Sequence, residues 1–129
     1  MRRVVITGIG IVSSIGSNAE EVKKSLFDCT PGISKAIGYD NLGFKSQVYG
    51  SPNIDLEENI DRKKLRFLAD GSAWAFIAAE QAITDAELDE SDVSNERTGL
   101  IVGTGGPSTR AIVKAADQTR DRGLDFYSS

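Results

Sequence analysis

The chain has 129 residues, of which 40% are hydrophobic and 26% charged, as expected for one globular domain of ordinary size. No apolar run approaches the length of a membrane span, so we expect no membrane partner. Since 15 Lys and Arg face 19 Asp and Glu, the net charge of -4 argues against nucleic acid or an anionic membrane surface as the main partner.

Histidine is absent from the chain. This excludes Ser-His-Asp and Cys-His catalysis and imidazole metal ligands from these residues. The single cysteine, Cys29, excludes a disulfide framework and a thiolate zinc site, and it is typical of a reducing compartment. We therefore expect a cytoplasmic chain with no metal site and no cofactor.

The first predicted element is a strand at Val4, Val5 and Ile6, an apolar β-branched run of the kind buried on both faces in α/β sheets. Glycines and serines interrupt the apolar stretch, and no small-residue cleavage site precedes the next charged segment, so a secretory signal is disfavoured. Gly8 and Gly10 predict a tight turn after this strand.

These two glycines could begin a dinucleotide-binding fingerprint, but Ser13 occupies its third glycine position and the next helix starts too late. A Walker-type phosphate loop is absent as well. The simpler interpretation is that Gly8 and Gly10 let the chain turn sharply and let a helix or second strand approach closely.

A short helix is predicted from about Asn18 to about Asp28, because Ser17 and Glu20 have capping-box spacing. Residues 30–32 (Thr-Pro-Gly) end it. Cys29 follows Asp28 at the negative end of this helix, where a thiolate is disfavoured, so it is expected to have a packing or loop role and not a nucleophilic one.

Glycines and Pro52 break the pattern over residues 33–59, which predicts one or two short strands or a long ordered loop. Apolar and small residues at steps of three and four then predict a central helix from about Leu65 to about Ala86, buried on more than one side. Its expected inner face comprises Leu65, Leu68, Ser72, Phe76, Ala79, Ile83 and Ala86.

Residues 88–95 read as an acidic linker, and residues 100–102 (Leu-Ile-Val) as a second buried strand beside the first. A glycine turn at residues 103–106 leads to a helix opened by Pro107. Free backbone N–H groups at this helix start could hold an anion or an acyl carbonyl, although a plain strand-to-helix turn explains the glycines equally well. The order of elements predicts an α/β fold. The expected inner face of the last helix comprises Ala111, Ile112, Ala115, Ala116 and Thr119.

A charged cluster begins the long helix. It fits a solvated face, with Asp61 near the helix N-terminus and Arg66 paired to Asp70. It also fits a docking surface for an acidic partner, because four cations within five residues can attract a negatively charged protein. These cations are Arg62, Lys63, Lys64 and Arg66.

Three stretches together carry a resemblance: residues 1–16 (MRRVVITGIGIVSSIG), residues 60–67 (IDRKKLRF) and residues 98–108 (TGLIVGTGGPS). In this order and spacing they resemble the N-terminal part of β-ketoacyl-acyl carrier protein synthases, specifically the synthase I type of bacterial fatty acid elongation. The resemblance covers about residues 1–120, roughly the first third of that family's chain.

The resemblance implies a thiolase-type fold, a duplicated α/β architecture of which this chain is the N-terminal portion of the first half. We divide the chain into residues 1–122, which follow the family, and a divergent tail at residues 123–129. This tail predicts either a fragment or the product of a truncated reading frame. Because such a piece leaves the long helix without its cover, we expect the isolated chain to be oligomeric or loosely folded.

In that family a cysteine and two histidines carry out the decarboxylative condensation, and the resemblance places all three beyond Ser129, so we expect no catalytic residue in this chain. Gly105 and Gly106 match the turn that lines the acyl-chain pocket near the subunit interface of the homodimer. The cations between Arg62 and Arg66 match a region near the entrance for the acidic acyl carrier protein. The alternative is a noncatalytic module that binds acyl carrier protein or dimerises.

Overall fold

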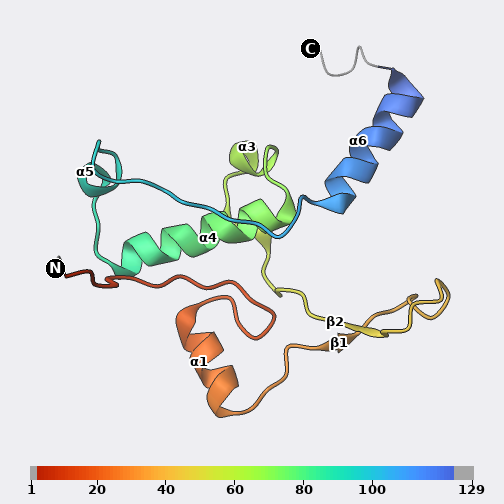
Figure 1. Cartoon of the computed structure of the whole chain (residues 1–129), viewed down its shortest axis with the longest axis horizontal. Helices are drawn as coiled ribbons and strands as arrows, with labels where there is room; N and C mark the ends of the chain where they lie inside the picture. Colours follow the sequence, from red (N-terminus) through yellow and green to blue (C-terminus); the bar gives the residue numbers. More distant parts are fainter. Residues whose placement is uncertain (1–2, 124–129) are drawn as a thin grey trace.

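A computed structural model describes residues 3–123. Its longest helix, α4 (Asp70–Asp85), lies between extended segments and shorter helices (Figure 1). The other helices are α1 (Ala19–Phe27), α2 (Leu56–Asn59), α3 (Arg62–Leu65), α5 (Glu90–Val93) and α6 (Thr109–Arg122). Strands β1 (Ser34–Lys35) and β2 (Val48–Tyr49) pair antiparallel. The regular secondary structure of the described residues is therefore helical, with few strands.

The two predicted buried strands are wrong for this structure. Residues 4–6 and 100–102 form no strand, and Val4 is 92% exposed and Ile101 97% exposed. A central strand needs a hydrogen-bonded neighbour on each side and cover on both faces. Among residues 3–123, only β1 and β2 form a sheet, so these apolar runs have neither.

Helix α1 confirms the predicted short helix, with its start shifted by one residue. Its N-cap is Asn18, whose side chain accepts a hydrogen bond from the Glu21 backbone N–H at 2.9 Å. The Glu21 carboxylate accepts from the Ser17 backbone N–H at 2.8 Å. The reciprocal cap is thus built on Asn18 and Glu21, and the predicted pair of Ser17 and Glu20 is wrong.

At its other end, α1 closes through Cys29, whose φ of 53° lies in the left-handed region. The Thr30 N–H donates to the Ser25 carbonyl at 2.8 Å, and the Cys29 N–H donates to the Leu26 carbonyl at 3.4 Å. This pair of bonds is a Schellman motif. It gives the exposed Cys29 a loop role.

The long predicted helix is divided into α3 and α4. The Phe67 and Leu68 N–H groups bond back to Lys64 and Leu65 at 3.0 and 3.1 Å, three residues earlier, which tightens the end of α3. Ala69 then adopts an extended conformation before α4 begins. The resulting bend lets Leu65 and Leu68 both pack against the same core cluster.

That cluster consists of Ile60, Ala73 and Ile77. Ala73 and Ile77 are the buried residues of α4, whereas Ser72, on the predicted inner face, is exposed. The predicted inner face is thus wrong at Ser72, whereas Leu65, Leu68 and Phe76 from the same face pack against the cluster. The solvent-accessible surface of the chain is 11186 Å², whereas a compact monomer of this mass exposes about 6,600 Å². Association or loose folding of the isolated chain stays a prediction, which sedimentation can check.

The N-terminal segment lies antiparallel along α4 (Figure 1). A side chain at Gly10 would collide with the Ala78 carbonyl oxygen, and one at Gly8 with that of Ala82. The close approach of a helix to these glycines is thereby confirmed. Gln81 fixes the segment twice, accepting from the Ile11 N–H at 3.0 Å and donating to the Ser17 carbonyl at 2.7 Å. Asp85 accepts from the Ile9 N–H at 2.9 Å.

The remaining elements lie before and after α4 in the chain. Residues 33–59 contain two short strands, one of the predicted alternatives. The acidic linker contains the single-turn helix α5, closed by a capping box between Asp89 and Asp92. The first residue of α6 is Thr109, after the N-cap Ser108, and not Pro107 as predicted. No residue of this helix is buried: of its predicted inner face, Ala116 and Thr119 are half-buried and the other three residues are exposed. α6 ends at Arg122, and residues 124–129 of the predicted tail lie outside the described residues.

Within residues 3–123, no helix has both the length and the hydropathy for crossing a membrane. The same residues contain no grouping of three His, Cys, Asp or Glu side chains placed to hold a metal ion.

Candidate functional site

The predicted docking cations lie on and just after α3. The Asp61 carboxylate caps this helix by accepting a hydrogen bond from the Lys63 N–H at 2.7 Å. Each cation is exposed, and among residues 3–123 none of them forms an ion pair. Their charges are thus free to meet an acidic surface. The four are Arg62, Lys63, Lys64 and Arg66.

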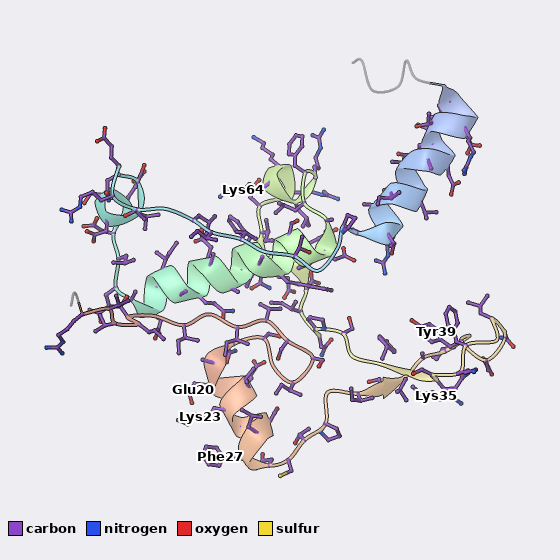
Figure 2. The ribbon with its side chains drawn as sticks, in the orientation of Figure 1. Glu20, Lys23, Phe27, Lys35, Tyr39 and Lys64 are labelled. Atoms are coloured by element: carbon purple, nitrogen blue, oxygen red, sulfur yellow. The ribbon has the colours of Figure 1, made fainter. Side chains whose placement is uncertain are left out.

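Lys64 is distinguished from the other three by its contact with α4. Its Nζ atom lies over the Phe76 ring, 5.1 Å from the centroid. Figure 2 marks Lys64 on α3, beside α4. The Arg66 guanidinium instead lies 5.9 Å from the ring of Phe67, which is 85% exposed. One cation therefore contacts the helix beneath it, while another contacts an exposed ring.

The predicted pair of Arg66 and Asp70 is wrong. The Asp70 carboxylate forms its ion pair with Arg110, at 3.0 Å between Oδ2 and Nη1. This contact joins the start of α4 to the first turn of α6 (Figure 1). A partner 40 residues away has no local signal in the sequence.

The predicted acyl-chain turn lies in the same region. Gly106 lines a groove of about 550 Å³ between the turn and the first residues of α4, but Gly105 is not among the residues that line it. The Thr104 hydroxyl donates to the Gly106 carbonyl at 2.8 Å and accepts from the Gly106 N–H at 3.3 Å. The Ser108 side chain caps α6 by accepting from the Ala111 N–H at 3.3 Å.

Both candidate sites adjoin α4: the groove is lined by residues from Ala69 to Ala75, and Phe76 supports Lys64. The structure thus brings Gly106 close to the start of α4 and leaves the cations on α3 accessible. Sequence reasoning missed Phe76 and Arg110 as members of this region. The spacing of Phe76 predicted only a core-facing position, and neither contact has a local signal, because each depends on how separate helices meet.

Comparisons with known proteins identify the family of this chain. Residues 1–128 match the family model described as "Beta-ketoacyl synthase, N-terminal domain". The chain is 48% identical over 126 residues to "3-oxoacyl-[acyl-carrier-protein] synthase 1" of Escherichia coli (strain K12), covering 96% of this chain and 31% of that protein. The Haemophilus influenzae protein of the same name is 44% identical over 120 residues, covering 93% and 30%.

A "3-oxoacyl-[acyl-carrier-protein] synthase 2" of Staphylococcus aureus (strain N315) is 31% identical over 123 residues, covering 95% of this chain and 30% of that protein. The chain therefore belongs to the β-ketoacyl synthase family, within its N-terminal domain. It is more similar to these relatives named synthase 1 than to the one named synthase 2. It spans less than a third of the length of each of them.

Proposed function

We propose that this chain forms the N-terminal part of a β-ketoacyl-acyl carrier protein synthase of type I. Such an enzyme condenses an acyl thioester with malonyl-carrier protein, with loss of carbon dioxide, in fatty acid elongation. The observation that carries the proposal is the 48% identity over 126 residues to a protein named synthase 1. The corresponding fold is thiolase-like, with this chain in its first α/β half, and its location is the cytoplasm.

The chain contributes framework and binding surfaces to this reaction, and no catalytic group. In the family, a cysteine is the nucleophile that takes the acyl group, and two histidines assist the condensation. The chain has no histidine, so Cys29, in the loop that ends α1, has no imidazole base within these residues. The nucleophile and the histidines must come from polypeptide other than these 129 residues.

The binding surface for acyl carrier protein is the group of cations on α3. Arg62, Lys63 and Arg66 are exposed and have no ion-pair partner among residues 3–123. An acidic carrier would be attracted by these charges, and the association rate would fall as salt is added. The whole enzyme would act as a homodimer, as its family resemblance implies.

The acyl chain is proposed to lie against the turn formed by Gly105 and Gly106. In this structure, a Cβ at either glycine would meet no atom within 4 Å. The space that the glycines leave open is thus available to a ligand or to another part of the polypeptide. Gly106 lines the groove beside α4 and Gly105 does not, so Gly106 is the better candidate for contact with an acyl chain.

A chimaera tests the enzyme proposal. Residues 1–122 replace the aligned segment of the Escherichia coli synthase 1, and condensation of acyl- and malonyl-carrier protein is measured. We expect condensation above a blank from the chimaera and none from the 129-residue chain alone. A folded but inactive chimaera would contradict the proposal, as would product from the isolated chain that is lost on Cys29→Ala.

The second candidate is a noncatalytic module that binds acyl carrier protein or dimerises. It is favoured by the cations of α3, which are complete within the chain and need no catalytic group to attract a partner. The DNA after codon 129 discriminates the two. An in-frame or frame-shifted continuation that encodes a cysteine and two histidines supports the synthase, whereas a separate gene with its own terminator supports the module.

A further inference from the structure

The four cations of the proposed docking surface do not face the same way. On a helix successive residues are separated by about 100°, so Arg62, Lys63 and Arg66 fall within about 100° of one another. Lys64 lies about 160° from Arg62 and about 160° from Arg66, and about 100° from Lys63. The backbone N–H bond from Arg66 to the Arg62 carbonyl, at 3.4 Å, keeps Arg66 on the helical path of α3. Arg62 and Arg66 therefore share one face, Lys64 lies almost opposite them, and Lys63 lies between.

The contact made by Lys64 agrees with this division. Its ammonium lies 5.1 Å from the centroid of the Phe76 ring on α4, within the range of a cation–π interaction. Phe76 itself packs against the core cluster of Ile60, Ala73 and Ile77. Lys64 is thereby linked to the core through one ring. For the other three cations, no such contact with α4 exists among the residues that the structure describes.

From these two observations we infer that Lys64 is a positioning residue of the proposed carrier-protein surface. It holds α3 against α4 through Phe76, so that Arg62, Lys63 and Arg66 present their charges together to the acidic partner. Lys64 does not contact that partner. The inference rests on the proposed function, because it assigns different roles to residues of the proposed docking surface.

A double-mutant cycle on the full 129-residue chain tests this division of roles, with purified bacterial acyl carrier protein as the probe. Affinity is measured by titration calorimetry for Lys64→Met, for Lys63→Met as the matched control, and for each of these in a Phe76→Leu background. We expect Lys63→Met to weaken binding about fivefold in both backgrounds. Lys64→Met should weaken binding about twofold in the wild-type chain and have no further effect when Phe76→Leu is already present.

Lys64→Arg supplies a second measurement that does not depend on the stability of Phe76→Leu. An arginine keeps the cation over the ring, so it should restore wild-type affinity to position 64. The association rate gives a third readout: Lys63→Met should reduce its salt dependence, and Lys64→Met should leave that dependence unchanged.

The outcomes separate this inference from the proposed function. If the wild-type chain does not bind the carrier protein, the docking proposal and the inference both fail. The inference alone fails if the chain binds but Lys64→Met weakens binding as much as Lys63→Met does, and by the same factor with and without the Phe76 ring. The inference is supported if Lys64→Met weakens binding only when the Phe76 ring is present, and if Lys64→Arg restores wild-type affinity.

Discussion

Two segments of this chain have the same sequence pattern and different surroundings. Each has an apolar triplet followed by glycines: residues 4–6 precede Gly8 and Gly10, and residues 100–102 precede the turn at residues 103–106. The first pair of glycines lies against the backbone of α4, with no room for a Cβ. The glycines of the second turn have open space around them.

The difference lies in the partner and not in the glycines. Along α4, Ala78 and Ala82 are small enough to let a backbone approach, and Gln81 and Asp85 accept hydrogen bonds from it. The second segment relies on local bonds, such as that between Thr104 and Gly106, and on the exposed ion pair that Arg110 forms. A glycine pattern thus permits close approach, and the opposite surface decides whether it occurs.

The largest expected effect separates the two segments directly. Gly10→Ala places a Cβ on the Ala78 carbonyl oxygen, so the segment must move away, which should lower the free energy of unfolding by about 2 kcal/mol. Gly105→Ala, the matched control, should change it by less than about 0.5 kcal/mol. Urea unfolding followed by Trp74 fluorescence measures both. Equal effects would remove the contrast between the segments.

The second effect concerns the hydrogen bonds of the first segment. Gln81→Met leaves the Ile11 N–H and the Ser17 carbonyl without this partner, at an expected cost of about 1–3 kcal/mol. The Ile11 amide should exchange with solvent faster, as hydrogen exchange by NMR would show. Glu80→Met, the neighbouring control on an exposed side chain, should leave that amide protected; unchanged protection in both variants would contradict the role of Gln81.

A smaller effect is expected where the second segment is attached. The side chains of Arg110 and Asp70 are 84% and 46% exposed, so their coupling in a double-mutant cycle with Arg110→Gln and Asp70→Asn should be at most about 0.5 kcal/mol. It should vanish in 1 M salt, where the screening length is about 3 Å. A coupling above about 2 kcal/mol would mean that the second segment is held as firmly as the first.

The smallest expected effect is the pH dependence of the stability of α5, which precedes the second segment in the chain. Hydrogen bonds from Ser91 and Asp92 lower the pKa of Asp89 below its ordinary value of 3.8. Since the folded pKa is the lower one, the capping box stabilises α5 above pH 3.8, and this stability is lost as pH falls through the folded pKa. NMR titration of the Asp89 carboxyl carbon measures the shift; loss of α5 with the same pH profile in Asp89→Asn would contradict this origin.

Two of the longer helices, α1 and α6, could be predicted from their local end signals, whereas the single-turn α5 was not, despite its capping box. Residues 18–28 and 107–122 contain their own caps, and α1 and α6 start within two residues of the expected positions. The break after α3 was missed because Ala69, the N-cap of α4, makes no side-chain cap bond and so gives no signal. The two strands failed for a different reason, because a buried strand is a property of its neighbours.

In the candidate site, too, local features could be predicted from the sequence and contacts between helices could not. The exposure of the cations on α3 follows from their local spacing and could be predicted. The ion pair of Asp70 could not, because an i, i+4 neighbour and a residue on α6 compete for the same carboxylate, and only the arrangement of the helices decides between them. The contact between Lys64 and Phe76 depends on the bend between α3 and α4 for the same reason.

The N-terminal segment and α4 also share a repeat length. Four helical residues rise about 6.0 Å, and two extended residues advance about 6.6 Å, so Gly8 and Gly10 can match Ala82 and Ala78 while alternate N–H groups meet Asp85 and Gln81. A slip by one residue would bring Ile9 against an alanine carbonyl and remove both hydrogen bonds. The segment can therefore shift only in steps of two residues, which fixes its register as firmly as pairing fixes that of a strand.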